Sequence, residues 1–259
     1  MLRPRIIPCL LVRNKGLVKT VRFNEGKYVG DPINAVRIFN EKEADELIVL
    51  DIDATAKGAG PDFKMIQFWA AECRMPLCYG GGVTSVEHAK AIIGLGVEKV
   101  ALSAAAIADP HLVAAIAQAV GNQSVVVVLD VKQQAAKKYE IWTHNATRNT
   151  GKCPIKFAAQ LQSLGAGEII LNSIDRDGEM KGYDLELVGL VREVVTIPLS
   201  VLGGAGSLKD IGSLIYQFGI IGAAAGSLFV FKGIYKAVLI NYPNPLTKDQ
   251  LIQSSIAGG

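Results

Sequence analysis

Two similar apolar runs of the sequence differ at the one position where chemistry could occur. The run IIPCLLV covers residues 6–12, and the run VVVVLDV covers residues 125–131. Asp130 in the second run has a carboxyl group that can take up or release a proton, whereas Leu11 at the corresponding place can do neither. If a reaction needs one acid and one base at these two positions, the sequence supplies only one of the two groups. Asp130 is therefore the first catalytic candidate, and a carboxylate that only accepts hydrogen bonds is the alternative.

Other carboxylates follow neighbouring apolar runs, at Asp51, Asp53, Asp175 and Asp177. Of these, Asp175 is kept as a second catalytic candidate. None of them stands at the end of the first run, and a misplacement of about one ångström already costs about a hundredfold in rate. We therefore do not expect these acids to replace a carboxylate at position 11.

Glycine-rich segments follow four of the apolar runs. They are GGGVTS (80–85), DRDG (175–178), GGAGS (203–207) and AGS (225–227). Backbone amides approach an anion closely where no side chain intervenes, and a helix that begins there adds a favourable dipole. Tight turns also need glycine, so a turn alone is the alternative at each segment. Together the segments favour two phosphate sites, and hence a ligand with a phosphate at each end.

Eight short apolar runs alternate with helix-like segments along the whole chain. The runs are RIIPCLLV (5–12), DELIVLDI (45–52), MPLCYGG (75–81), EKVALS (98–103), SVVVVLDV (124–131), GEIILNS (167–173), IPLSVLGG (197–204) and IIGAAAG (220–226). Segments such as VEHAKAIIGLGV (86–97) have the apolar spacing of a helix and close on glycine. Apolar strands that alternate with helices indicate a parallel sheet covered on both faces.

The second half of the chain repeats the first. ADELIVLDID (44–53) matches AGEIILNSID (166–175), and MPLCYGGGV (75–83) matches IPLSVLGGA (197–205) at the same offset. Four strands followed by four equivalent strands predict a closed barrel. A doubly wound open sheet is the alternative, but that fold gives no reason for two equivalent halves.

The predicted fold is therefore an α/β protein of one domain, a single (β/α)8 TIM barrel made of two similar half-barrels. The half-barrels cover about residues 1–120 and 121–240. Because Pro243 and Pro245 would break a helix, we expect an irregular C-terminal tail over residues 241–259.

The bulk composition excludes several classes of function. The net charge of +3 on 259 residues is too small to indicate a nucleic-acid partner. The four cysteines form no C-x-x-C pair and have no histidine at ligand spacing, so we expect neither a metal nor a disulfide framework. The longest apolar stretch, residues 219–231, is too short to span a membrane. We expect a cytoplasmic protein without a cofactor, with His88, His111 and His144 on its surface.

The chain resembles the cyclase subunit of imidazole glycerol phosphate synthase over nearly its whole length. The most specific stretches are GAGEIILNSIDRDG (165–178) and KGYDLEL (181–187), and the similarity extends to SLFVF (227–231). The resemblance implies that a glutaminase partner docks on the N-terminal face of the barrel. It also implies that ammonia passes through the barrel to a two-phosphate ribonucleotide at the C-terminal face.

The resemblance also assigns roles to individual residues of this chain. Phosphate contacts fall on Gly82, Ala104, Gly178, Gly204, Gly226 and Ser227. A flexible first loop carries Lys19, which the resemblance makes a further catalytic candidate, and a solvated lysine is the alternative. A ring of four charged residues that gates ammonia at the barrel floor falls on Arg5, Glu46, Lys99 and Glu168. Two cations and two anions cancel in such a constriction, and a purely structural cluster of salt bridges is the alternative.

The resemblance further implies two catalytic aspartates, of which Asp130 matches one and Leu11 replaces the other. A branch of the family associated with surface-polysaccharide synthesis, which converts an acetamido sugar to an acetamidino sugar, fits this departure. The sequence therefore favours an ammonia-channelling subunit with redirected chemistry and a phosphorylated small-molecule or sugar substrate. The alternatives are the cyclase of histidine synthesis and a non-catalytic scaffold that binds a phosphorylated metabolite.

Overall fold

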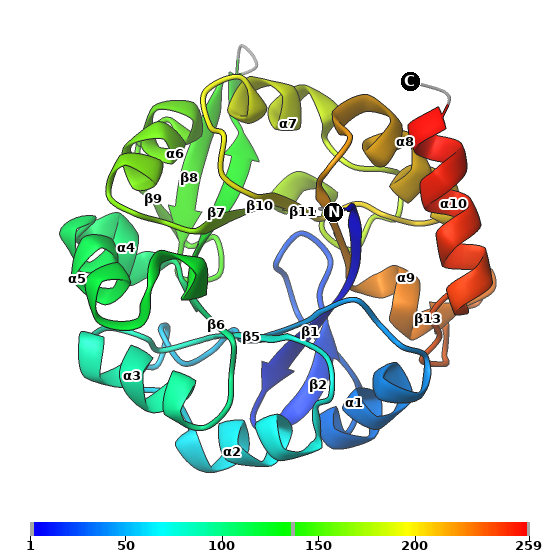
Figure 1. Ribbon diagram of the computed structural model, residues 1–259, viewed down its shortest axis with the longest axis horizontal. Helices are drawn as coiled ribbons and strands as arrows, with labels where there is room; N and C mark the ends of the chain where they lie inside the picture. Colours follow the sequence, from blue (N-terminus) through cyan, green and yellow to red (C-terminus); the bar gives the residue numbers. More distant parts are fainter. Residues whose placement is uncertain (1–2, 136–137, 258–259) are drawn as a thin grey trace.

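Eight parallel strands close into a barrel with helices around it, which confirms the predicted TIM barrel (Figure 1). The computed structural model describes residues 3–135 and 138–257. The barrel strands are β1 (Arg5–Arg13), β4 (Leu47–Asp51), β5 (Leu77–Gly80), β6 (Lys99–Leu102), β7 (Val125–Gln133), β10 (Glu168–Ser173), β11 (Leu199–Leu202) and β12 (Gly222–Ala225). Each of them lies within, or extends by one or two residues, one of the eight apolar runs of the sequence.

The barrel closes because its first strand pairs with its last. β1 lies between β4 and β12, with Cys9 opposite Ile48 on one side and Arg5 opposite Gly222 on the other. All eight barrel pairings are parallel. The carboxyl ends of all eight strands therefore meet at one end of the barrel.

Ten helices are present in the described part of the chain, and most of them cover the outside of the barrel (Figure 1). They are α1 (Pro32–Glu41), α2 (Phe63–Glu72), α3 (Val86–Gly94), α4 (Ala104–Ala108), α5 (His111–Val120), α6 (Pro154–Ser163), α7 (Leu185–Arg192), α8 (Leu208–Phe218), α9 (Ser227–Val230) and α10 (Pro245–Ala257). In α8, a capping box between Ser207 and Asp210 starts the helix, and its apolar face buries Ile211, Leu214 and Ile215. None of the described helices is long and apolar enough to cross a membrane.

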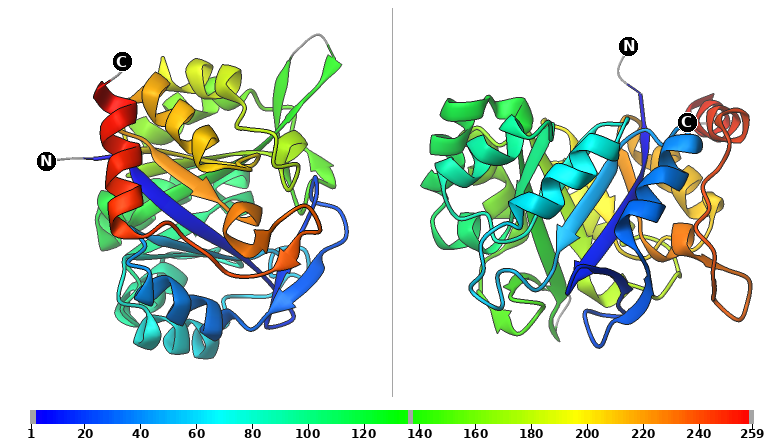
Figure 2. Two further views of the ribbon diagram at one scale, coloured as in Figure 1. Left: turned by 90° about the vertical axis from the view of Figure 1, so that its right-hand side faces the viewer. Right: turned by 90° about the horizontal axis from the view of Figure 1, so that it is seen from below.

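Six shorter strands form hairpins outside the barrel wall. They are β2 (Gly16–Lys19), β3 (Lys27–Gly30), β8 (Tyr139–Thr143), β9 (Arg148–Asn149), β13 (Phe231–Lys232) and β14 (Ala237–Val238). β1 pairs antiparallel with β2, and β7 pairs antiparallel with β8. Figure 2 shows these two hairpins projecting from the same end of the barrel, opposite the end where β1 begins. β1 and β7, the first strands of the two sequence repeats, are thus each followed by an antiparallel strand that forms a hairpin.

The barrel strands separate two apolar cores. The larger core lies between strands and helices, whereas a smaller one fills the barrel interior. Because side chains alternate along a strand, every second residue faces inward. On β1 the inward residues are Arg5, Ile7, Cys9 and Leu11; Ile7 and Cys9 belong to the inner core, and Leu11 packs against it.

The prolines of the C-terminal segment led us to expect an irregular tail, but this prediction was wrong. α10 covers Pro245–Ala257 and packs against α8, while residues 258–259 lie outside the described residues. Pro245 is the first helical residue, where the missing N–H costs nothing. Asn244 caps the helix, because its Oδ1 accepts a hydrogen bond of 2.8 Å from the Thr247 amide.

Substitution of this cap should weaken the helix measurably. We expect Asn244→Ala to lower the free energy of unfolding by about 1 kcal/mol, because the Thr247 amide loses its partner. Urea unfolding followed by circular dichroism measures the change, and Asn244→Asp, which retains a capping oxygen, is the control. Equal stability of Asn244→Ala and the wild type would show that α10 does not depend on this cap.

Candidate functional site

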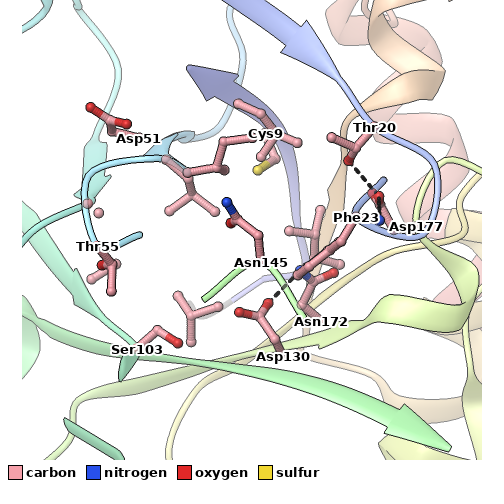
Figure 3. Close-up of a pocket in the computed structure, with 18 of the residues that line it drawn as sticks. Cys9, Thr20, Phe23, Asp51, Thr55, Ser103, Asp130, Asn145, Asn172 and Asp177 are labelled. Carbon is pink, nitrogen blue, oxygen red and sulfur yellow. Dashed lines mark hydrogen bonds between the residues drawn. The ribbon is translucent and has the colours of Figure 1, made fainter. Parts of the chain in front are cut away.

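A large cavity lies at the carboxyl ends of the barrel strands, where the site of a TIM barrel is expected. Its volume is about 620 Å³. The last inward residues of several strands line it, among them Leu11, Leu50, Asp130, Asn172 and Leu202. Figure 3 shows Asp130 and Asn172 side by side in this cavity. The cavity therefore joins apolar walls to a few polar groups.

The predicted floor ring assembles at the opposite end of the barrel. Lys99 Nζ lies 2.8 Å from Glu46 Oε1 and 2.8 Å from Glu168 Oε2. Arg5 pairs with Glu46 and lies 2.7 Å from Glu168 Oε1. Ser200, which the sequence did not suggest, donates a hydrogen bond of 2.5 Å to Glu168 Oε1. Cations and anions alternate around the ring, so each charge has two opposite neighbours.

The electrostatics of the ring favour the charged forms despite burial. Glu46 and Glu168 are each only 3% exposed. Burial alone would raise the pKa of Glu168, but the charges of Arg5 and Lys99 outweigh it and hold this pKa below its ordinary value. The same pairing raises the pKa of Lys99 against the effect of burial. The ring is thus a neutral, mutually stabilised cluster.

An apolar interior separates the floor ring from the cavity. It is formed by the inward residues of the barrel strands: Ile7, Cys9, Ile48, Cys78, Ala101, Val126, Val128, Ile170, Leu202 and Ala224. Leu11 and Leu50 pack against this cluster at the cavity end. No ionisable side chain other than the two buried thiols belongs to this inner cluster in the described chain.

Asp130 lies deep in the cavity, on β7. Its Oδ1 accepts a hydrogen bond of 2.8 Å from Asn172 Nδ2 on the neighbouring strand β10. Burial raises the pKa of Asp130 to about 7, the Asn172 hydrogen bond lowers it, and the charge of Asp177 raises it. A carboxyl group that titrates near neutrality is suited to proton transfer. Leu11 lines the same cavity from β1 and offers no such group.

Lys19 lies in the cavity, on a strand and not on the flexible loop that the resemblance implied, and the alternative of a solvated lysine does not hold. Lys19 ends strand β2, which folds back along β1 and returns the side chain to the barrel mouth. Lys19 is 6% exposed, and its Nζ donates a hydrogen bond of 2.7 Å to the Cys9 carbonyl. Burial lowers the pKa of Lys19. A Cβ at Gly226 would lie 2.5 Å from this Nζ, so Gly226 provides the space for the ammonium group.

All six predicted phosphate contacts line the cavity: Gly82, Ala104, Gly178, Gly204, Gly226 and Ser227. Backbone packing explains three of the glycines without a ligand. Gly82 has φ +67°, and a Cβ there would lie 2.5 Å from the Ala59 carbonyl oxygen. Gly178 has φ +69° and a Cβ there would lie 2.2 Å from the Thr20 carbonyl oxygen, while one at Gly204 (φ +112°) would lie 2.2 Å from that of Gly182. These close approaches require glycine and also leave the backbone open to the cavity.

Comparison with known proteins agrees with this architecture. The family model described as histidine biosynthesis protein matches residues 5–236. The chain belongs to this family.

Its relatives place it among the HisF-like proteins, the family of the cyclase subunit of imidazole glycerol phosphate synthase. The chain is 57% identical to a provisionally named imidazole glycerol phosphate synthase subunit, hisF3, of Vibrio vulnificus over 98% of both chains. It is 50% identical to a provisionally named subunit, hisF2, of Pseudomonas aeruginosa, over 94% of this chain and 97% of the relative. Identity is 43% to imidazole glycerol phosphate synthase subunit HisF of Hyphomonas neptunium, over 89% and 91% respectively.

Three side chains of this HisF-like chain lie elsewhere than we expected. Asp175 is not among the residues that line the cavity, and its Oδ2 accepts a hydrogen bond of 2.7 Å from the Gln133 amide. His88 and His144 line the cavity, although both were expected on the surface, whereas His111 is exposed. His144 reaches the cavity because the turn after β8 has three residues with positive φ, His144, Asn145 and Ala146. Asn145 also lines the cavity, and nothing in the sequence pattern signals this turn.

Titration of Asp130 should be visible in the stability of this HisF-like barrel. A pKa raised from 3.8 to about 7 means that the ionised form is disfavoured in the folded state. Ionisation of Asp130 therefore lowers the free energy of unfolding as pH rises through the interval between these two pKa values. We expect Asp130→Asn to be more stable than the wild type by on the order of 4 kcal/mol at pH 8 and nearly equal to it near pH 4. Urea unfolding at both pH values tests this, and a difference independent of pH would contradict it.

Proposed function

We propose that this chain is the HisF-like synthase subunit of a glutamine amidotransferase. In this proposal a glutaminase subunit docks on the N-terminal face of the barrel and delivers ammonia at the floor ring. The ammonia crosses the apolar interior and reaches a phosphorylated small-molecule or sugar acceptor in the cavity. The observation that carries the proposal is that a complete charged ring leads into an apolar interior that opens on a cavity with Leu11 at its wall.

The chemistry of the interior favours ammonia over ammonium. A bare ion in an apolar environment loses its hydration without compensation, whereas neutral ammonia loses only hydrogen bonds. The inner cluster offers aliphatic side chains and two buried thiols, of which Cys9 has a pKa raised by burial to about 12. Neither thiol is ionised at neutral pH, so the interior has no fixed charge between the ring and Lys19.

The cavity supports a ligand with phosphate groups. Glycines 82, 178, 204 and 226 expose backbone at its wall, and Lys19 adds the one buried lysine among its lining residues. The segments that carry these glycines lie after different strands, so a ligand with two phosphates could span the mouth.

Sugar amidination is the acceptor chemistry that we propose. Ammonia adds to the acetamido carbon, a C–N bond forms, and the C–O bond breaks. Because an amide oxygen is a poor leaving group, a phosphoryl or nucleotidyl group is first transferred to it from a donor. The oxygen then leaves with that group as phosphate or a nucleoside monophosphate, the ammonia nitrogen gives up one proton, and an acetamidino group remains. Asp130 can accept a proton in these reaction steps, and they do not require a second carboxylate at position 11.

Coupled glutamine hydrolysis tests the proposal. The chain is co-purified with a candidate glutaminase-like protein, and glutamate release is measured with and without phosphorylated or acetamido-sugar ligands. We expect hydrolysis to rise at least tenfold when this chain is present. A partner that is equally active alone would overturn the ammonia-channelling role, and ligand binding without any effect on hydrolysis would support a non-catalytic scaffold.

The cyclase of histidine synthesis is the second candidate. It is favoured by the 43% identity to the Hyphomonas neptunium subunit and by the presence of Asp130. In that case ring closure would have to proceed with Leu11 in place of an acid.

A further inference from the structure

Two leucines expose apolar surface inside the cavity. Leu11 on β1 and Leu50 on β4 are partners in register, both pack on the inner cluster, and both line the cavity. They are half-buried, whereas Cys9 and Ile48, one inward position below them, are each 1% exposed. Leu11 and Leu50, here called the leucine pair, are thus the end of the apolar interior that a ligand in the cavity can touch.

A glycine beside the leucine pair extends this apolar wall. Gly80 on β5 is the register partner of Leu50. A Cβ at Gly80 would lie 2.8 Å from Leu50 Cδ2, so the leucine side chain occupies the space that the glycine leaves free. On the other side of Leu11, the space at Gly226 holds the ammonium group of Lys19. The wall is therefore apolar from β1 to β5 and ends at a cation.

The wall across the cavity is polar. In the eight-stranded barrel, β7 is the fourth strand from β1 in either direction, so these two strands lie opposite each other (Figure 1). β10 lies opposite β4 for the same reason. β7 and β10 contribute Asp130 and Asn172 to the cavity lining, and Asn172 donates its hydrogen bond to Asp130. The leucine pair thus faces a hydrogen-bonded polar pair.

The exposed part of the leucine pair does not stabilise the fold. Apolar surface contributes to folding only where it is removed from water, and this part faces the cavity. It contributes to binding when an apolar group of a ligand covers it. An apolar wall opposite a polar wall selects a small group that is apolar at one end and polar at the other.

We propose that the leucine pair is the subsite for the methyl group of the acceptor's acetamido substituent. The methyl group packs against Leu11 and Leu50, and the oxygen and nitrogen of the substituent point toward the polar wall. This orientation places the acyl carbon over the end of the apolar interior, where ammonia arrives. The inference rests on the proposed function and makes Leu11 and Leu50 specificity-determining residues for its acceptor.

The subsite selects its ligand by size and by polarity. One methylene group more or less in an apolar pocket changes binding by about 10-fold to 200-fold. A formamido sugar lacks the methyl group and leaves the leucine pair uncovered. A hydroxyacetamido sugar places a hydroxyl group against two side chains that offer it no hydrogen bond, which costs free energy. Both should therefore bind more weakly than an acetamido sugar.

Binding of N-acylated glucosamine 1-phosphates to the whole chain tests the subsite. Isothermal titration calorimetry compares N-acetylglucosamine 1-phosphate with its N-formyl, N-hydroxyacetyl and N-propionyl analogues. We expect the wild type to bind the acetyl probe at least tenfold more tightly than the formyl and hydroxyacetyl probes, and more tightly than the propionyl probe. Leu11→Ala makes room for a longer acyl group, so this variant should prefer the propionyl probe. Misfolding cannot produce such a gain.

A neighbouring leucine on the same strand provides the matched control. Leu10 belongs to the core between strands and helices and lies outside the cavity lining, so Leu10→Val should keep the wild-type order of affinities. Leu50→Ala should remove the preference for acetyl over propionyl, as Leu11→Ala does. Equal binding of the formyl and acetyl probes to the wild type, no binding of the acetyl probe, or the wild-type order in a folded Leu11→Ala protein would overturn the subsite.

The probes require neither a glutaminase nor an activating donor, so the two proposals fail separately. A preference for the acetyl probe without any effect of the chain on glutamine hydrolysis would leave the subsite and remove the ammonia-channelling role. Coupled hydrolysis with equal binding of the formyl and acetyl probes would do the reverse.

Discussion

Replacement of Lys99 by methionine should lower the free energy of unfolding by about 3–5 kcal/mol, the largest stability effect that we expect from one substitution. Lys99 is the only cation besides Arg5 in the floor ring of the described chain, and it lies 2.8 Å from both Glu46 and Glu168. Without it, two carboxylates that are each 3% exposed share one cation. The cost comes from the uncompensated buried charge, because methionine fills most of the volume of the lysine stem.

Guanidinium unfolding of three variants checks this explanation. Lys90→Met changes an exposed lysine of α3 and should have an effect below about 0.5 kcal/mol. The double variant Lys99→Met/Glu46→Gln restores a neutral ring and should recover most of the loss. If Lys99→Met were as stable as the wild type, the ring would not be a coupled buried cluster.

Acid should also reduce the stability that the ring gives to the wild-type protein. The pKa of Glu168 is lower in the folded protein than its ordinary value of 4.5. A carboxylate with a lowered pKa stabilises the fold above its unfolded pKa, and this contribution is lost as pH falls through the folded pKa. The stability difference between wild type and Lys99→Met should therefore shrink below pH 4.5.

Replacement of Leu11 by aspartate should raise the rate of imidazole ring closure at least about 100-fold over the wild type. Leu11 lines the cavity at the position of β1 that corresponds to Asp130 on β7. The variant would place two carboxylates in one cavity with different surroundings. Such pairs separate their pKa values, so that one acts as acid and the other as base.

The assay supplies ammonium chloride and the two-phosphate aminoimidazole precursor to the isolated chain, so it does not depend on a glutaminase. Leu11→Asn has nearly the same shape as Leu11→Asp but transfers no proton, and it should remain inactive. A wild-type rate as high as that of Leu11→Asp would instead establish the chain as the cyclase of histidine synthesis.

The sequence by itself determined the element order and the type of fold. Its eight apolar runs correspond to the eight barrel strands, because a strand buried on both faces must be apolar along its length. The charged residues at the start of four runs and Asp130 near the end of another could also be located, since alternation along a strand is a local property. The equivalence of the two half-barrels remains a prediction.

Only the tertiary structure decided which of these residues meet. Arg5 and Glu168 are separated by 163 positions and come together because the barrel closes between β12 and β1. Lys19 becomes buried because the β1–β2 hairpin folds over the mouth, and α10 forms because Asn244 caps it ahead of Pro245. Asp175 was expected in the site but lies outside the cavity lining, whereas His144 was expected on the surface but lines the cavity. Loop geometry decides both positions. Strand periodicity reaches only a few residues, whereas barrel closure, strand register and loop conformation depend on contacts between residues that are distant in sequence. Such contacts place Asn172 beside Asp130.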